Sequence, residues 1–357
     1  MNLGIFLSPG DNLTRQKNSG QLDRLINYYL KPYSKAFNQV YLFSYGDTGK
    51  KFSLPARVIL VPKPILIPYQ LYQFILPFLH QKTIKQINVF RVFQATGGLP
   101  ALFINKPFIV TYGYHYGQFA RLEGSPIKAQ LMNWLVRPIL KKAKKIIVTS
   151  KTNQAYLKNY QSKLKLIPNG VDPQVFKPSK TKPSKHLILT IGRLVHQKNH
   201  QLLLKAISQS KFKSKVKLII IGQGRLKSQL IKLAKQEGIE LRIIPQLPHQ
   251  SLVKWYQSAG IFALTSKLEG QPKVLLEALS AGCACLTTPF EGNLIIHQQT
   301  GLTASTSKGL ANQLDKLIKD QKLRRRLSYN GRQFIIKRFD IKKLVQQEIK
   351  LLKSCSN

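Results

Sequence analysis

Short apolar runs alternate with longer amphipathic stretches along almost the whole chain, and this pattern limits the fold more than any other feature. The runs at 58–61 and 217–221 have the length and β-branched composition of buried strands. The stretches at 127–142 and 151–160 have apolar residues at helical spacing. Such alternation predicts parallel sheets with helices on both faces, and hence the α/β fold class.

The alternation is interrupted near Lys177, where KPSKTKPSK has no periodicity and the composition of a linker. With 357 residues, the chain is long enough for two domains. We therefore predict a Rossmann-like domain at 1–176, a linker at 177–185 and a second Rossmann-like domain at 186–338. The segment 339–357 has one apolar helix face, which needs another element to pack on. In such sheets, ligands bind outside the carboxyl ends of the strands.

The net charge is +43, from 57 Lys and Arg against 14 Asp and Glu. Such a surface attracts nucleic acid, anionic lipid or phosphorylated substrates, and a host with generally basic proteins explains the charge equally well. The three cysteines have no zinc-ligand spacing, which favours a reduced, cytoplasmic setting. The first residues lack the features of a signal peptide, and prolines and Lys63 interrupt the most apolar region, 58–79. We expect a protein that is soluble or lies on a surface.

The second half begins with a predicted strand that ends at Gly192, followed by Arg193 and Lys198 on the loop to the next helix. Exposed amides, a helix N-terminus, a guanidinium fork and an ammonium group together suit a diphosphate. A solvated basic loop explains Lys198 alone as well, so Arg193 is the more specific signal. The nearby IGQGRLK resembles an incomplete GxGxxG with Lys227 at its third position, and favours a tight strand–helix turn.

Two of the scarce carboxylates, Glu269 and Glu277, lie eight positions apart in EGQPKVLLEALSAG. Pro272 is placed to begin a helix, so that Glu277 lies one to two turns into it. An ionised carboxylate accepts two hydroxyl hydrogen bonds at once, as a ribose diol or a sugar requires. The amides at 271–274 are suited to an anionic phosphate. Two glutamates on a solvated helix face are the simpler interpretation of this segment taken alone.

Five segments in order resemble the retaining glycosyltransferases of family 4, which have the GT-B fold of two Rossmann-like domains facing each other across a cleft. They are PNGVD at 168, IGRL with QKN at 191–199, IGQG at 221, EGQPKVLLEALSAG at 269, and EGN with TGL at 291–302. The resemblance covers 165–305 well and the first half loosely. It implies a C-terminal helix that packs back on the first domain, which carries the acceptor, and a second domain that binds the donor.

The resemblance also assigns roles to single residues. Arg193 and Lys198 would hold the diphosphate and stabilise the leaving nucleotide, Glu277 would bind the ribose, and Glu269 would contact the transferred sugar. The expected donor-binding residues are Gly192, Arg193, Lys198, Glu269, Gly270, Gln271, Pro272, Lys273, Val274 and Glu277.

On the acceptor side, the resemblance implies a loop containing Ser19 and Gly20, where many relatives have two glycines. His115, in TYGYHYGQFAR, is either an active-site group with Arg193, Lys198 and Glu269 or a loop residue packed among aromatic rings. His196 and His200 are expected at the surface. No cofactor and no metal are implied, because two cations replace the metal, and the seven Asp residues form no DxD pair.

We therefore expect transfer of a hexosyl group from a nucleotide-sugar, with retention, in polysaccharide, lipopolysaccharide or glycolipid synthesis. The acceptor would be a glycan or a lipid-linked sugar at the cytoplasmic face of a membrane. Basic and aromatic segments at 65–79 and 128–145 suit an anionic membrane surface, although core helices with solvated lysines explain them too. The alternative is a non-catalytic GT-B-shaped protein that binds anionic lipid or nucleic acid. Nucleic acid is favoured less, because the chain has no RNP, zinc or helix-turn-helix signature.

Overall fold

The computed structural model describes residues 1–356, apart from the side chain of Lys128. It divides the chain into two compact units. Unit 1 contains Met1–Pro168 and the segment that begins at Lys342, and unit 2 is Asn169–Ile341. Each unit is built on a parallel sheet with helices, so the α/β class is confirmed.

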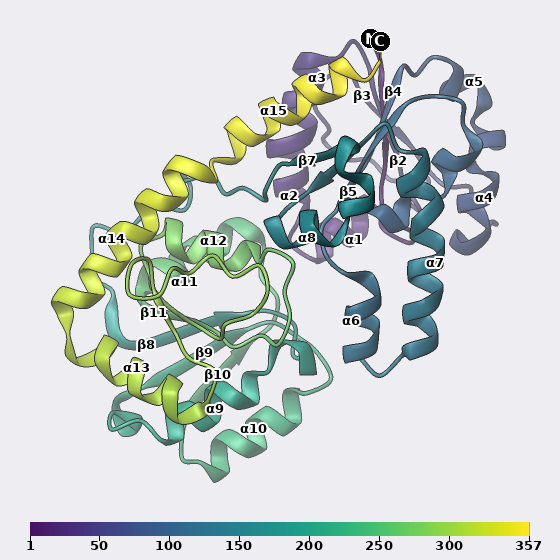
Figure 1. Cartoon of the computed structure of the whole chain (residues 1–357). Coiled ribbons are helices and arrows are strands. Elements are labelled where there is room, and N and C mark those ends of the chain that lie inside the picture. Colours follow the sequence, from purple (N-terminus) through teal and green to yellow (C-terminus); the bar gives the residue numbers. More distant parts are fainter. Residues whose placement is uncertain (357) are drawn as a thin grey trace. The chain divides into compact units, whose positions relative to one another are not determined.

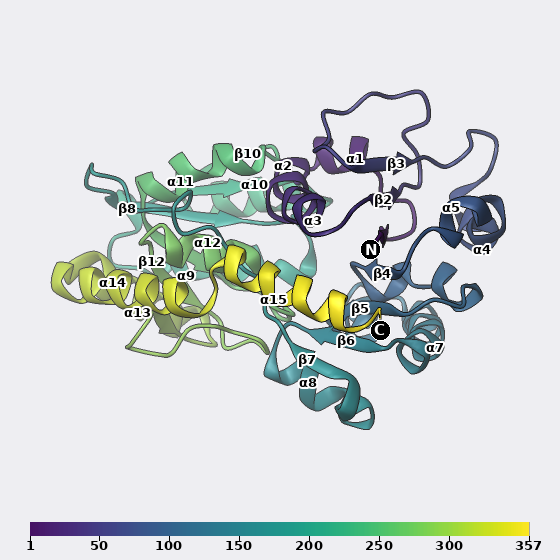
Figure 2. The same ribbon diagram turned by 90° about the horizontal axis from the view of Figure 1, so that it is seen from above.

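In the described part of unit 1, seven parallel strands form a sheet in the order β3-β2-β1-β4-β5-β6-β7. Figure 2 shows β4, β5, β6 and β7 of this sheet in succession. The strands are β1 (Leu3–Phe6), β2 (Val40–Phe43), β3 (Val58–Val61), β4 (Val89–Val92), β5 (Phe108–Tyr112), β6 (Lys145–Val148) and β7 (Leu164–Leu166). β1, β2, β4 and β5 are buried along their whole length, as parallel strands covered on both faces require.

The helical elements of unit 1 are α1 (Leu13–Asn18), α2 (Leu22–Leu25), the π-helix η1 (Ile26–Leu30), α3 (Lys31–Ala36), α4 (Tyr69–Leu79), α5 (Gln81–Lys85), α6 (Tyr116–Leu122), α7 (Pro126–Lys142), α8 (Lys151–Tyr156) and α15 (Ile341–Ser354), with short 3-10 turns η2 (Ala95–Gly97), η3 (Pro100–Phe103) and η4 (Lys158–Lys163). Helices α4, α5 and α7 cover one face of the sheet with a core that includes Tyr72, Ile84 and Ile139.

The C-terminal helix α15 packs on unit 1, as the sequence predicts. Its Glu348 is buried and forms an ion pair with Arg91 of β4, with Nε and Oε1 2.5 Å apart. Tyr33 of α3 donates its hydroxyl hydrogen bond to the same carboxylate oxygen. Arg91 also donates to Thr111 Oγ1 at 2.7 Å. A buried polar network therefore joins α15 to β4, β5 and α3.

In the described part of unit 2, six parallel strands form a sheet in the order β10-β9-β8-β11-β12-β13. They are β8 (Ser184–Ile191), β9 (Lys217–Ile221), β10 (Glu240–Ile244), β11 (Ala259–Leu264), β12 (Ala284–Thr287) and β13 (Leu302–Thr303). The helical elements are η5 (His196–Lys198), α9 (His200–Ser208), η6 (Lys213–Lys215), α10 (Lys227–Gln236), η7 (His249–Ser251), α11 (Leu252–Ser258), α12 (Lys273–Ser280), α13 (Ser307–Lys319) and α14 (Gln321–Arg338).

The side chains of this sheet alternate between two cores. Helices α9, α10 and α13 pack on the face that presents Ile188, Ile220 and Ile261. Helices α11 and α12 pack on the opposite face, which presents Leu189 and Phe262. Figure 1 shows α11 and α12 on one side of the strands and α9 and α10 on the other. This arrangement is the doubly wound sheet that the sequence predicts.

The sequence placed the first domain boundary at residue 176, whereas unit 1 ends at Pro168. The segment after Pro168 contributes buried side chains to unit 2, because Val171 exchanges backbone hydrogen bonds with Phe339 and Ile341 at 2.9 and 3.0 Å. Phe176 is also buried in the core of unit 2. The expected linker, 177–185, overlaps the start of β8 at Ser184.

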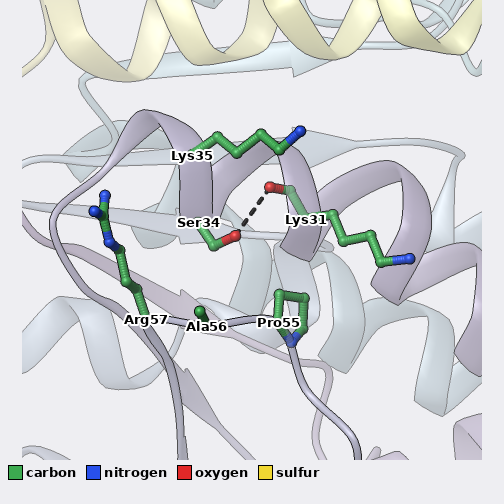
Figure 3. A pocket seen from close by; sticks show the side chains of 6 residues that line it. All are labelled: Lys31, Ser34, Lys35, Pro55, Ala56 and Arg57. Carbon is green, nitrogen blue, oxygen red and sulfur yellow. Dashed lines mark hydrogen bonds between the residues drawn. The ribbon is translucent and has the colours of Figure 1, made fainter.

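A hollow on unit 1 lies beside α3 and the start of β3 (Figure 3). It is lined by Lys31, Ser34, Lys35, Pro55, Ala56 and Arg57. No residue predicted for the site lines this hollow. Among residues 1–356, no helix is long and apolar enough to cross a membrane.

Candidate active site

The loop after β8 lies against the end of β9. Gly192 donates its backbone N–H to Ile221 at 3.0 Å, and Leu194 donates to Gln223 at 3.0 Å. The two chains approach so closely that a Cβ added to Gly222 would lie 1.9 Å from the carbonyl oxygen of Gly192. The close packing of the two loops therefore explains why residue 222 is glycine, without a bound phosphate.

The first of two polar clusters joins Lys198 to Glu269, which are 71 positions apart in sequence. Lys198 Nζ lies 2.5 Å from Glu269 Oε1, and the two side chains are 13% and 9% exposed. Ser266 Oγ donates to the same oxygen at 2.6 Å. Strand order explains the contact, because β8 and β11 are neighbours and their carboxyl ends meet at one edge of the sheet.

Gln197 connects Arg193 to the loop after β11. The Arg193 guanidinium donates to Gln197 Oε1 at 3.2 Å, and Gln197 Nε2 donates to the carbonyl of Leu268 at 2.7 Å. The backbone N–H of Lys267 donates to the Gln197 carbonyl at 2.8 Å. Arg193 itself remains exposed, so its guanidinium can bind an anion while Gln197 holds one of its nitrogens.

Asn199 explains how the short loop turns into α9. Its φ of 49° is left-handed, a conformation that asparagine adopts more readily than most residues. Thr265 of the β11 loop donates to the Asn199 carbonyl at 3.0 Å. The QKN segment thus brings Gln197 and Lys198 to the Glu269 loop and starts the next helix.

His200 corrects one expectation. His196 is exposed as predicted, but His200 is buried, so its prediction as a surface residue was wrong. Its Nε2 lies 3.3 Å from the carbonyl oxygen of Arg193. Burial lowers the pKa of His200 to about 4, because the imidazolium form would lose its hydration. We infer that its neutral ring supports the Arg193 turn.

The loop from Glu269 to α12 is fixed from two sides. A Cβ on Gly292, which has a φ of 79°, would lie 1.9 Å from the carbonyl oxygen of Gly270. The backbone N–H of Asn169 donates to the side-chain oxygen of Gln271 at 2.5 Å. The side-chain amide of Asn169 donates to the backbone carbonyl of Gln271 at 3.0 Å. Pro272 is the N-cap residue of α12, and Lys273 and Val274 are its first two residues.

Glu277 lies in a second, buried cluster. Its Oε1 is 2.9 Å from His249 Nε2, and its Oε2 accepts the Tyr256 hydroxyl at 2.9 Å. All three side chains are less than 5% exposed. The helix that carries Glu277 is therefore not a solvated face, which was the simpler interpretation of this segment.

The predicted residues of unit 1 lie on other elements. Ser19 is the C-cap residue of α1, and Gly20, with a φ of 67°, precedes α2. His115 is buried between β5 and α6, where its ring lies edge-on to Tyr156 at 3.9 Å between centroids and contacts Tyr112. Of the two interpretations of His115, the structure shows the aromatic packing; its catalytic role stays a prediction.

The sequence did not single out four residues that the structure places in these clusters or, for Asn169, against Gln271 of the adjoining loop: Asn169, Gln197, His249 and Tyr256. Asn169 and Gln197 lie in the motifs PNGVD and QKN, which could have indicated them. These motifs were interpreted only as a turn and a basic loop. No pattern marks His249 and Tyr256, which lie 28 and 21 positions from Glu277. Among residues 1–356, no group of three His, Cys, Asp or Glu side chains has the arrangement of a metal site.

Two family models match adjoining parts of the chain. The model of the glycosyl transferases group 1 matches residues 171–334. The model of glycosyltransferase family 4 matches residues 29–175. The chain belongs to the group 1 glycosyltransferases of family 4. Both polar clusters of this family member lie within the group 1 match.

Curated relatives align with part of the chain. One from Campylobacter jejuni, named N-acetylgalactosamine-N,N'-diacetylbacillosaminyl-diphospho-undecaprenol 4-alpha-N-acetylgalactosaminyltransferase, is 30% identical over 170 residues, which are 46% of each chain. A second, named GalNAc-alpha-(1->4)-GalNAc-alpha-(1->3)-diNAcBac-PP-undecaprenol alpha-1,4-N-acetyl-D-galactosaminyltransferase, is 28% identical over 59% of this chain and 60% of the relative. The chain thus spans about half the length of the curated relatives it matches.

Solved structures of this family's fold match the chain over nearly its whole length. A sucrose-phosphate synthase from Thermosynechococcus elongatus has a TM-score of 0.81 at 17% identity, and covers 99% of this chain and 98% of its own. The GT-B fold is therefore confirmed.

Proposed function

We propose that the chain is a retaining glycosyltransferase that moves a hexosyl group from a nucleotide-sugar to an acceptor, in polysaccharide, lipopolysaccharide or glycolipid synthesis. The observation that carries the proposal is the pairing of Lys198 with Glu269 beside the exposed guanidinium of Arg193. These groups lie at the carboxyl ends of β8 and β11, where such sheets bind ligands. Family membership supports the same activity.

The proposed reaction breaks the bond between the anomeric carbon and the diphosphate oxygen, and the diphosphate keeps the electron pair. A bond forms from the same carbon to the acceptor oxygen with the anomeric configuration retained, and the proton of the acceptor hydroxyl passes to the departing diphosphate oxygen. Negative charge grows on the diphosphate, and fixed cations stabilise it most where water is excluded. In our proposal, Arg193 and Lys198 are these cations, and no metal is needed.

In the same proposal, Glu269 and the loop amides after it contact the transferred sugar. The carboxylate of Glu269 is an acceptor for sugar hydroxyls, and Lys198 and Ser266 orient it. Glu277 binds the ribose of the nucleotide. Ser19 and Gly20 remain proposals for the acceptor side, and His115 remains a proposed catalytic residue.

A thermal-shift panel tests the donor. We expect one of the UDP-, GDP- or ADP-sugars to raise the melting temperature, because a ligand that binds only the folded state stabilises it. A ligand at 100 times its Kd adds about 2.7 kcal/mol to the free energy of unfolding. The same donor with acceptor should release the nucleoside diphosphate. No shift with any donor, together with salt-dependent binding of nucleic acid, would support the non-catalytic alternative instead.

The acceptor is proposed to be a lipid-linked sugar at the cytoplasmic face of an anionic membrane, since the two Campylobacter jejuni relatives are named for acceptors on diphospho-undecaprenol. An exposed apolar surface on unit 1 supports this proposal. The α4 surface consists of Ile65, Leu66, Leu71, Phe74, Phe78 and Phe103. Leu66 and Phe78 are 93% and 69% exposed. A group of exposed apolar side chains, unlike a single one, is typical of an interaction surface.

Charge around the α4 surface suits anionic lipid. Residues 48–171 contain 19 Lys and Arg and a single acid, Glu123. Lys82 and Lys85 of α5 are exposed on the element that follows α4. Apolar side chains that insert into the headgroup region, surrounded by cations, are typical of proteins that lie on membranes.

Replacing Phe78 by aspartate should lower binding to vesicles of phosphatidylcholine with 30% phosphatidylglycerol by about tenfold, because one apolar anchor is lost. Cosedimentation measures the bound fraction. Tyr329→Asp, on the 66% exposed Tyr329 of α14, is the matched control and should bind as the wild type does. Equal loss in both variants would assign the binding to net charge and refute the α4 surface.

A further inference from the structure

The hollow on unit 1 is lined by three cationic side chains. Lys31 and Lys35 belong to α3, and Arg57 directly precedes β3. Figure 3 shows Arg57 on one side of the hollow and Lys31 on the other, with the buried Ser34 between them. The hollow has a volume of about 510 Å³, within the range of roughly 300–1,000 Å³ that is usual for small-molecule sites. Its lining suits an anionic molecule larger than a single phosphate ion.

The segments around the hollow supply no carboxylate to neutralise these cations. Between Asp23 and Glu123, the sequence contains one acidic residue, Asp47. Asp47 follows the carboxyl end of β2, and its carboxylate accepts two backbone N–H groups at the start of α1 and the hydroxyl of Ser44. This carboxylate therefore serves α1, whereas the hollow lies beside the amino ends of the strands.

The three cations also have few partners of their own. Within residues 1–356, none of them forms an ion pair. Lys31 Nζ donates to Asn27 Oδ1 at 2.7 Å and keeps two further N–H donors. Glu348 of α15, the helix that packs on α3, is paired with Arg91. The positive charges of the hollow are thus left for a partner from solution.

Arg57 has a backbone conformation that arginine rarely adopts. Its φ of 67° is left-handed, and it is the third residue of a turn in which the N–H of Val58 donates to the carbonyl of Pro55 at 3.1 Å. Glycine or asparagine is favoured at such a position, because a Cβ crowds the backbone there. The Arg57 carbonyl accepts the N–H of Val40 at 2.8 Å, which fixes the turn against β2. An arginine in place of the less strained glycine indicates a task for its guanidinium.

We propose that the hollow on unit 1 binds a small molecule with two or more phosphate groups. The Arg57 guanidinium binds one group as a fork, and Lys31 and Lys35 bind another. The lining comes from two short segments, 31–35 and 55–57, which are compact enough for a small molecule and form no track for a polymer. The site is additional to the donor site, because ligands of the transfer reaction bind at the carboxyl ends of the strands.

Lysine footprinting with inorganic diphosphate tests the proposal on the full chain. Exposed lysines are acetylated at a limiting dose of acetic anhydride, and the rate at each lysine is measured by mass spectrometry. With diphosphate at about ten times its Kd, acetylation of Lys31 and Lys35 should slow by about tenfold, because their ammonium groups react only when the site is empty. The rate at the exposed Lys205 of α9 should not change.

Arg57→Gly separates binding from folding. It removes the guanidinium and places at the left-handed position the residue that adopts this conformation most readily. We expect the diphosphate concentration that protects Lys31 and Lys35 to rise by about tenfold or more, while the melting temperature stays the same or increases. Lys35→Met leaves the turn unaltered and should weaken the protection of Lys31 likewise. Arg326→Gln, on the exposed face of α14, is the matched loss of one cation and should alter neither protection nor stability.

The remaining outcomes decide between ligands. Inorganic phosphate should protect the same lysines about tenfold more weakly than diphosphate, because it reaches fewer cations, and equal affinity would refute a ligand with two phosphate groups. Equal protection of Lys205, or unchanged protection in Arg57→Gly, would assign the binding to net charge and overturn the site. Vesicles of phosphatidylcholine and phosphatidylglycerol should bind Arg57→Gly as they bind the wild type. A loss of vesicle binding in Arg57→Gly, without protection by diphosphate in the wild type, would make the hollow a lipid contact instead.

Discussion

Replacement of Lys198 by methionine should slow glycosyl transfer by about 100-fold or more, the usual effect of removing one group that stabilises transition-state charge. Methionine keeps most of the length of lysine and removes the ammonium group, so the leaving diphosphate loses one of two fixed cations. Glu269 simultaneously loses its partner at 2.5 Å and keeps Ser266. Initial rates at saturating donor, with the nucleotide-sugar that gives the largest thermal shift, measure the effect.

A lysine on the following helix provides the control. Lys205 of α9 is exposed, so Lys205→Met removes the same charge away from the cluster and should retain wild-type turnover. Lys198→Met should also lower the free energy of unfolding, because it leaves the partly buried Glu269 carboxylate without its counter-charge. The double variant Lys198→Met/Glu269→Gln should recover this stability but not the turnover. Full activity in Lys198→Met would remove Lys198 from the mechanism and leave Arg193 as the sole candidate cation.

Replacement of Glu348 by alanine should lower the free energy of unfolding by about 3–5 kcal/mol, the typical cost of breaking a buried ion pair on one side. Arg91 is 3% exposed and would keep Thr111 and a backbone carbonyl as hydrogen-bond acceptors, but no counter-charge. The loss should be detected in urea titrations followed by far-ultraviolet circular dichroism.

Two comparisons show whether the charge or the side-chain volume is responsible. Lys350→Ala removes an exposed side chain from the same helix and should change the free energy of unfolding by less than about 0.5 kcal/mol. Arg91→Met/Glu348→Leu replaces the pair by apolar side chains and should cost far less than Glu348→Ala alone. If the single and double variants lose the same stability, the lost interactions of the pair itself, and not an uncompensated charge, explain the effect.

Several strands were predictable to the residue. β3 and β9 have the bounds that the sequence indicates, because a short apolar run marks a strand both in the buried β9 and in the partly exposed edge strand β3. The prolines of 58–79 argued only against a membrane-spanning helix, and the segment 65–79, interpreted as a surface or core helix, contains α4. In the structure, Pro68 is the N-cap residue and Pro77 lies near the C-terminal end, where it interrupts few hydrogen bonds.

The sequence also determined which side chains follow the strand ends, and these include Arg193 and Glu269. In a parallel sheet every carboxyl end lies on the same edge, so a strand order is not needed to predict that such residues share a side of the sheet. The motifs that mark family membership lie on these loops for the same reason. Sequence alone was therefore sufficient for the fold and for the location of the proposed donor site.

Only the tertiary structure decided which of these residues touch. Lys198 meets Glu269 because β8 is paired with β11, which is its neighbour in the sheet although β9 and β10 intervene in the chain. The contacts of Gln271 with Asn169, and of His249 and Tyr256 with Glu277, likewise depend on packing between elements far apart in sequence. A periodic pattern reports the environment of each residue along its own element, whereas a pairwise contact depends on where the chain returns in space.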